Sequence, residues 1–188
     1  MTVESLSKLI TLPALPVDCG SVEGWQRIEE SLSTALPNDY KKYINRFGSG
    51  SIGRFLWPFN PFSRNENLNL IEQVKIRLNA LQVLKDRFSE KHPYPLYPEM
   101  GGLLPWGATD NGDVLFWLTD GKPDDWIVVI NESRGPKFEK FEETTTSFLS
   151  KLITGDIVSN IIPNDFLDKD ALFVPEKKAG HSRHSVGS

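Results

Sequence analysis

The chain has few of the residues on which many catalytic and metal sites depend. Its 188 residues include one cysteine, Cys19, and three histidines, of which only His92 lies outside the C-terminal tail. A single cysteine cannot close an internal disulfide or build a multi-cysteine zinc site, and this usage is typical of a reducing compartment. A histidine-activated nucleophile would need His92 beside it, and nothing in its spacing from Cys19 favours such a pair. We therefore expect a protein that is not a hydrolase of this type and that holds no metal or cofactor.

Long apolar runs are also missing. No stretch approaches the roughly 20 apolar residues that cross a bilayer. The apolar segment over residues 9–17 precedes Cys19, but Pro13 and Pro16 interrupt it. Asp18 moreover occupies the position where a lipoprotein signal requires a small residue. The sequence thus predicts a cytoplasmic protein that does not act on a membrane.

Positive charge does not dominate the chain. Lys and Arg number 21 against 25 Asp and Glu, a formal charge of -4, which argues against a nucleic-acid partner. The acidity is concentrated between Glu99 and Asp125, where six acids accompany one base and the local charge is -5. The rest of the chain sums to +1, from 20 bases and 19 acids. Five of the six acids are aspartates of two predicted loops: Asp110, Asp113, Asp120, Asp124 and Asp125.

The composition is that of an ordinary globular domain, with 39% hydrophobic and 11% aromatic residues. A single domain of this length buries roughly 70% of the surface that its unfolded chain exposes, so one core suffices. We expect an N-terminal lead over residues 1–20 and one domain over residues 21–175. Residues 176–188 are expected to form a disordered tail, because almost no large apolar residue occurs there.

Hydrophobic periodicity predicts three helices and a strand in the first half of the chain. Apolar residues recur at steps of three and four over residues 25–36, and again over 40–47, where Gly48 is placed to end the helix. Residues 51–59 have the β-rich composition of a strand. The longest amphipathic pattern covers residues 65–88 and predicts one long helix.

The second half changes to the period of strands. Asn111-Gly112 is the dipeptide most typical of a tight hairpin turn, and apolar runs flank it on both sides. The run over residues 114–119 is apolar on both faces, so it is either covered on both sides or exposes an adhesive patch. The fold class expected is α+β, with helices packed on a central, mostly antiparallel meander over about residues 103–141. The elements predicted there are strands 103–109, 114–119, 126–131 and 137–141 and a helix over 145–154.

Two motif matches are rejected on their context. Gly48 to Gly53 spells a dinucleotide-binding fingerprint, but a helix precedes it and a strand follows it, the reverse of the order that places a phosphate at a helix N-terminus. The aspartate loops lack the alternating ligands and closing glutamate of a calcium loop. Two interpretations of these aspartates remain. They either serve turn geometry through their own backbone contacts, or they form one negative surface for a partner.

Four segments of the chain resemble one family. They are Trp25 to Glu29, the stretch LPNDYKKYINRFGSGSI over residues 36–52, the stretch YPLYPEMGGLLPWGATDNGDVLFW over residues 94–117, and DDWIVVI over residues 124–130. Together they are similar to the SUKH superfamily, and more narrowly to the bacterial relatives of the yeast cell-wall-assembly regulator and killer-toxin-resistance protein. The resemblance spans about residues 25–173. It implies an α+β fold with a central sheet and carries no shared catalytic residues.

The resemblance also implies a function. Many bacterial members are understood as immunity proteins that bind and neutralise a toxin domain, often a nuclease, so we expect a non-enzymatic antitoxin whose partner is a protein. The alternative is a regulatory or scaffolding domain like the fungal relatives. A nuclease presents a basic cleft, in which Asp110, Asp113, Asp120, Asp124 and Asp125 could imitate phosphates. Trp57 and Phe59 are the candidate aromatic anchors, although core packing is expected for at least one of them.

Overall fold

Within its described residues, the chain folds around one seven-stranded antiparallel sheet flanked by five α-helices, as the sequence predicted for an α+β protein. The computed structural model describes residues 2–88, 93–167 and 172–176. The sheet order is β6-β5-β4-β3-β2-β1-β7. The helices are α1 (Val3–Leu9), α2 (Val22–Leu32), α3 (Asn38–Phe47), α4 (Leu70–Arg87) and α5 (Thr145–Thr154). The strands are β1 (Gly50–Ile52), β2 (Leu56–Pro58), β3 (Leu103–Thr109), β4 (Val114–Leu118), β5 (Ile127–Asn131), β6 (Phe138–Phe141) and β7 (Phe173–Pro175).

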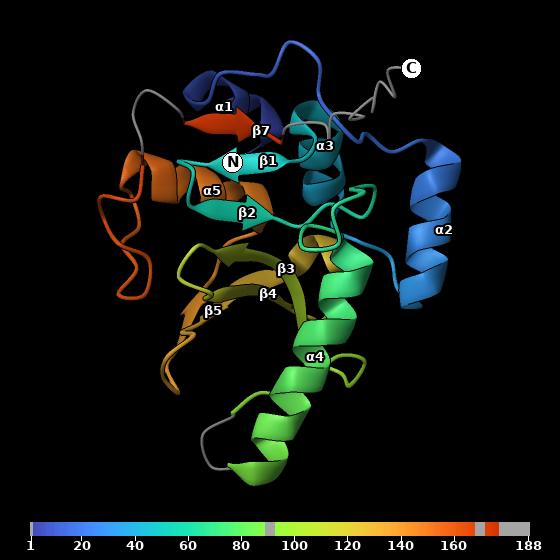
Figure 1. The fold of residues 1–188 in the computed structure, drawn as a ribbon, viewed down its shortest axis with the longest axis vertical. Helices are drawn as coiled ribbons and strands as arrows, with labels where there is room; N and C mark the ends of the chain where they lie inside the picture. The colour runs from blue at the N-terminus through green and yellow to red at the C-terminus, as the bar shows by residue number, and fades with distance from the viewer. Residues whose placement is uncertain (1, 89–92, 168–171, 177–188) are drawn as a thin grey trace, which may run out of the picture.

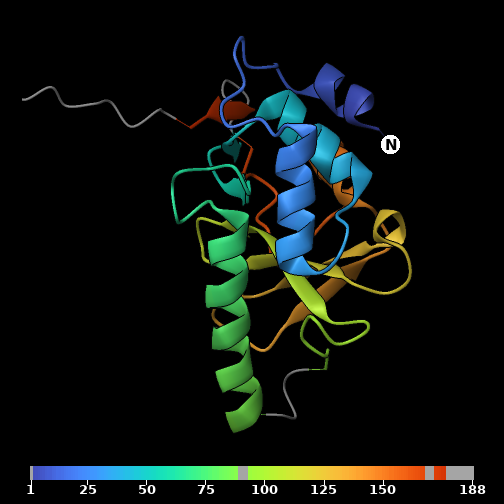
Figure 2. The ribbon, with the colours of Figure 1, turned by 90° about the vertical axis from the view of Figure 1, so that its right-hand side faces the viewer.

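Both faces of the sheet are covered, which explains why β4 is apolar on both sides. Leu115 and Trp117 of β4 belong to the main core, which the sheet shares with α1, α3 and α5. Phe116 belongs to a second core on the other face, together with Leu81 of α4. Figure 1 shows α4 crossing in front of the strands while α5 lies behind them. In the view of Figure 2, α4 runs along one side of the sheet and continues past it at its C-terminal end.

The predicted long strand over residues 51–59 is wrong in one respect. It is a hairpin of two short strands, β1 and β2, in which Ile52 is paired with Leu56. The chain reverses at Gly53 and Arg54, both of which have positive φ angles of about 60°. The turn brings β2 alongside β3 and leaves β1 to pair with β7.

Helix α1 and strand β7 were not predicted from the sequence. Helix α1 lies in the segment expected to be a lead, and its Val3 and Leu6 are buried in the main core. Strand β7 pairs with β1 and extends the sheet by one strand. The first residue of the predicted tail, Glu176, accepts a hydrogen bond from Asn65. The remaining residues of that tail, 177–188, lie outside the described part of the chain.

Within the described residues, no helix combines the length and the apolar character that crossing a bilayer requires.

Candidate functional site

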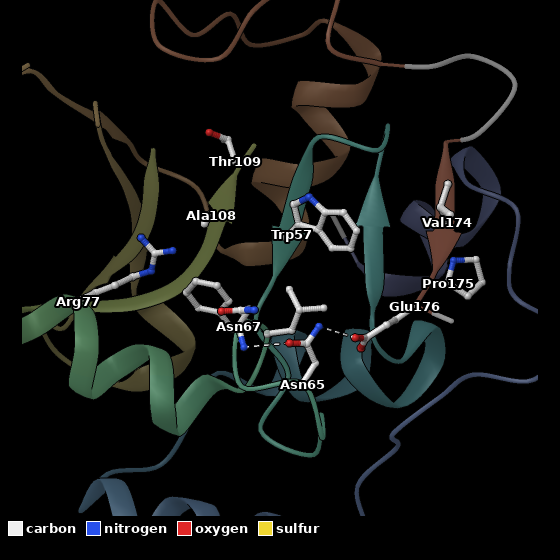
Figure 3. Close-up of a pocket in the computed structure, with 11 residues that line it drawn as sticks. Trp57, Asn65, Asn67, Arg77, Ala108, Thr109, Val174, Pro175 and Glu176 are labelled. Atoms are coloured by element: carbon white, nitrogen blue, oxygen red, sulfur yellow. Dashed lines mark hydrogen bonds between the residues drawn. The ribbon is translucent and has the colours of Figure 1, made fainter. Parts of the chain in front are cut away.

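An open groove of about 590 Å³ lies on one face of the sheet, where α4 does not cover the strands. Helix α4 packs against β3, and the groove opens beside the helix, between β2 and β7. Side chains of residues paired across neighbouring strands point to the same face of the sheet. Trp57 therefore shares a face with its partner Ala108, and Val174 shares a face with its partner Ser51. Figure 3 shows Arg77 of α4 at one side of the groove, β7 at the other and the loop before α4 along the bottom. This volume is within the range of small-molecule and peptide-side-chain pockets.

The two aromatic residues selected from the sequence both line this groove. Trp57 on β2 is half-buried, and its indole Nε1 donates a hydrogen bond to Asp110 Oδ1 at 2.7 Å. Phe59 is 1% exposed, so its ring belongs to the core and contributes little accessible surface. Of the pair, Trp57 alone presents a broad aromatic surface that a partner could reach, in agreement with the expectation that at least one of them serves core packing.

Arg77 was not predicted as a site residue, and it is the base among the described residues that line the groove. Its guanidinium carbon lies 5.2 Å from the centre of the Phe59 ring, and its Nε donates to Gln73 Oε1 at 3.0 Å. Burial lowers the pKa of this guanidinium, although an arginine stays charged at any physiological pH. No acid among the described residues forms an ion pair with it. A partly desolvated cation that pairs with no acid of the described residues is therefore held at the side of the groove.

The opposite side of the groove is acidic but internally satisfied. Glu176 follows β7, and its carboxylate accepts hydrogen bonds from Asn65 Nδ2 at 2.7 Å and from Ser63 Oγ at 3.3 Å. Asn65 Oδ1 in turn accepts from the backbone N–H of Asn67 at 3.0 Å, which shapes the loop at the bottom of the groove (Figure 3). The same loop ends at Asn69, whose side chain caps α4. These contacts hold the loop that precedes α4 in place between that helix and β7. The groove is therefore already formed in the folded protein.

Two of the five predicted aspartates lie close to the groove. Asp110 orients the Trp57 indole, as described above, and its carboxylate is exposed. Asp113 is only 3% exposed. Its carboxylate accepts from the Thr109 hydroxyl at 2.7 Å and from the Ser133 backbone N–H at 3.0 Å, which ties two neighbouring hairpins together. For Asp113, turn and hairpin geometry accounts for the residue type.

The other three aspartates lie at the opposite end of the sheet. Because β3, β4 and β5 form an antiparallel meander, the β3–β4 turn and the β4–β5 loop are at opposite ends of β4. The expectation that the two loops form one negative surface is therefore wrong. Asp124 accepts from the backbone N–H and from Nδ2 of Asn38, both at 2.7 Å, and so caps the N-terminus of α3. The Asn38 bonds, the backbone one first, lower the pKa of Asp124. Asp120 and Asp125 are exposed.

The described part of the chain contains no cluster of three or more His, Cys, Asp or Glu side chains arranged to hold a metal ion. Cys19 is exposed and forms no disulfide. The conceivable partner considered for it, His92, lies outside the described residues.

One comparison with known proteins gives a match. The family model SUKH_6, described as SMI1-KNR4 cell-wall, matches residues 23–149, more than half of the chain. The chain belongs to the SUKH family. No curated protein and no solved structure matches it. The SUKH match includes β2, α4 and β3, and hence Trp57 and Arg77, whereas β7 and Glu176 lie beyond it. The groove is thus built from the SUKH region and closed at one side by a segment that follows it.

Proposed function

We propose that this SUKH protein is a non-enzymatic immunity protein that acts in the cytoplasm, where it binds a cognate bacterial toxin domain and neutralises it. The toxin class proposed is a nuclease. Membership of the SUKH family carries the proposal, because the resemblance of the sequence to this family implies an immunity protein that binds a toxin domain. The chain's own geometry adds a surface suited to a protein partner, the groove around Trp57 and Arg77.

The groove combines features that are typical of protein-binding sites. Tryptophan and arginine are the residues most enriched among the energetically dominant contacts of interfaces. Trp57 is fixed by its bond to Asp110, so little side-chain entropy is lost when a partner packs on the ring. The acidic loops support a nuclease partner less directly, because the carboxylates of Asp113 and Asp124 are used within the fold.

Rescue of a toxin-producing cell tests the function. The partner is captured from the source cell, its toxin domain is produced in a second host, and growth is measured with and without this protein. Wild type is expected to restore growth, and Trp57→Ala is expected to lose rescue because an anchor of this kind contributes about 2 kcal/mol or more, roughly a 30-fold loss in affinity. Leu15→Ser is the control, since Leu15 is apolar, 84% exposed and not part of the groove. Unimpaired toxicity in the presence of wild type would refute the immunity role.

The second candidate is a regulatory or scaffolding domain, which the description of the matched family, SMI1-KNR4 cell-wall, favours. Such a domain would use the same groove for a protein that is not a toxin. Genome context separates the two candidates, because an adjacent gene ending in a toxin domain is expected only for immunity.

A further inference from the structure

The groove has a chemical asymmetry that indicates what it binds. Its apolar floor is the accessible face of Trp57 with Val174 and Pro175 beside it, above the buried side chains of Phe59, Leu68 and Ala108. At one side stands Arg77, whose charge is not neutralised by any acid of the described chain. The acid at the other side, Glu176, is occupied by Asn65 and Ser63. A ligand that fills this groove gains most if it places an apolar group on the floor and an anion at the Arg77 side.

Building on the toxin-binding role proposed above, we propose that the groove recognises an acidic–apolar segment of the toxin domain: an exposed aspartate or glutamate that pairs with Arg77, next to an apolar side chain that packs on Trp57. The guanidinium is suited to this because its fork of N–H groups matches a carboxylate, and the Nε bond to Gln73 leaves the two terminal nitrogens to face a ligand. Packing over the Phe59 ring at 5.2 Å holds the group in place before binding.

Partial burial makes the pairing more favourable than an ion pair at an open surface. Arg77 has already lost part of its water in the folded protein, so a partner carboxylate has less hydration to displace there. Asp110 accepts from the indole Nε1–H at the edge of the Trp57 ring, which leaves the face of the ring to the ligand. A protein segment is preferred over a small free anion because the anion would leave the apolar floor unfilled.

Two blocked peptides test the inference without the toxin. The first is acetyl-Ser-Leu-Asp-Phe-Ser-amide, and the second carries asparagine in place of the aspartate. The readout is the NMR signal of the Trp57 indole N–H, assigned by its disappearance in Trp57→Phe. The acidic peptide is expected to shift this signal saturably, and the asparagine peptide is expected to bind about tenfold more weakly, because it lacks the charge that pairs with Arg77. Equal binding of the two peptides, or no binding of either, would overturn the inference.

Variants on helix α4 locate the preference. Arg77→Gln is expected to bind both peptides equally, and Arg77→Lys to keep part of the preference because it keeps the charge but not the fork. Arg87→Gln is the matched control, as it makes the same change at an exposed position at the end of the same helix. Thermal unfolding of each variant shows whether it is folded, and Arg77→Lys keeps the test decisive if Arg77→Gln does not fold. A preference that survives in both Arg77 variants would contradict the assignment.

Two further measurements separate the inference from the proposed function. If wild type binds and inhibits the toxin but shows no preference for the acidic peptide, the groove assignment fails and the immunity role stands. If the peptides behave as expected but no toxin is inhibited, the immunity role fails and the groove assignment stands. Inorganic phosphate provides the last arm: a phosphate affinity equal to that of the acidic peptide would show a site for small anions and would overturn the proposal of a protein segment.

Discussion

Asp124 gives the clearest test of whether the acidic loop serves the fold, because one substitution removes a defined contact. Its two carboxylate oxygens accept from the backbone N–H and from the side-chain amide of Asn38, each at 2.7 Å. Pro37, which precedes α3, provides no side-chain cap of its own. Asp124 therefore supplies from a distant loop the acceptor that a capping residue normally supplies from the helix itself.

The magnitude follows from the values of helix caps and helix-end charges. Removing a capping oxygen costs about 1 kcal/mol, within a range of about 0.5–2, and a carboxylate at an exposed helix N-terminus contributes about 0.3–1 kcal/mol. We expect Asp124→Ala to lower the free energy of unfolding by about 1–2 kcal/mol. Each kcal/mol lost should lower Tm by about 2–4 °C. The loss stays limited because Tyr40, Tyr43 and Phe47 hold α3 in the core by packing.

Chemical denaturation at two pH values is the assay. The pKa of Asp124 is lowered in the folded state, so its stabilisation is complete above the unfolded value of about 3.9 and is lost as pH falls through the folded value. The difference between wild type and Asp124→Ala should thus be full at pH 7 and shrink below about pH 4. Asp125→Ala is the matched control, since no hydrogen bond of the Asp125 side chain to a described residue is found. Equal stability of the two variants at pH 7 would refute the reasoning.

Three other outcomes are expected. Asp113→Ala should lower the free energy of unfolding, measured by urea titration, by about 2 kcal/mol. The reason is that this carboxylate is 3% exposed and that its loss would leave the Thr109 hydroxyl and the Ser133 N–H without this acceptor. A loss under about 0.5 kcal/mol would contradict the contact. The double change Asp120→Lys and Asp125→Lys should keep stability within about 0.5 kcal/mol. Because these two charges lie at the end of the sheet away from the groove, they would act by long-range attraction to a basic nuclease. The change should therefore weaken toxin binding by slowing association and flatten its salt dependence, while unchanged binding would show that the charge account of this loop is wrong. Gly48→Ala should cost at least about 1–3 kcal/mol by thermal unfolding, as its φ is 73° and an added Cβ would lie 2.2 Å from the Val17 carbonyl oxygen; near-wild-type stability would argue against this backbone geometry.

Local patterns in the sequence predicted those parts of the fold that local physics determines. The faces of β4 followed from simple alternation, since Trp117 and Phe116 enter different cores. Helix α3 followed from the spacing of its buried residues and from Gly48 at its end. The division of residues 51–59 into two strands was not predicted, because the composition of the segment as a whole is typical of one strand. The turn depends on Arg54, which adopts a left-handed conformation that its residue type does not indicate.

The candidate site was only partly predictable, because it depends on contacts between distant segments. In the sequence Arg77 is one of several charges on an amphipathic helix, and only the packing of α4 against β3 places it over Phe59. The grouping of the aspartates failed for a topological reason. Successive loops of an antiparallel meander alternate between the two ends of the sheet, so Asp110 and Asp120 cannot share a surface. Trp57 was predicted as an anchor, and its place in the groove keeps that prediction open to test.

The central claim is that the protein neutralises a toxin by binding it through the groove. Titration of the purified toxin domain with the purified protein tests this most directly, with residual toxin activity measured at each ratio. With the toxin well above the dissociation constant, wild type is expected to abolish the activity at a defined stoichiometric ratio. With the toxin held well below the dissociation constants of both proteins, Trp57→Ala should require roughly 30-fold more protein than wild type for half inhibition. Full toxin activity at a large excess of wild type would contradict neutralisation, and equal inhibition by Trp57→Ala would contradict the groove as the binding surface.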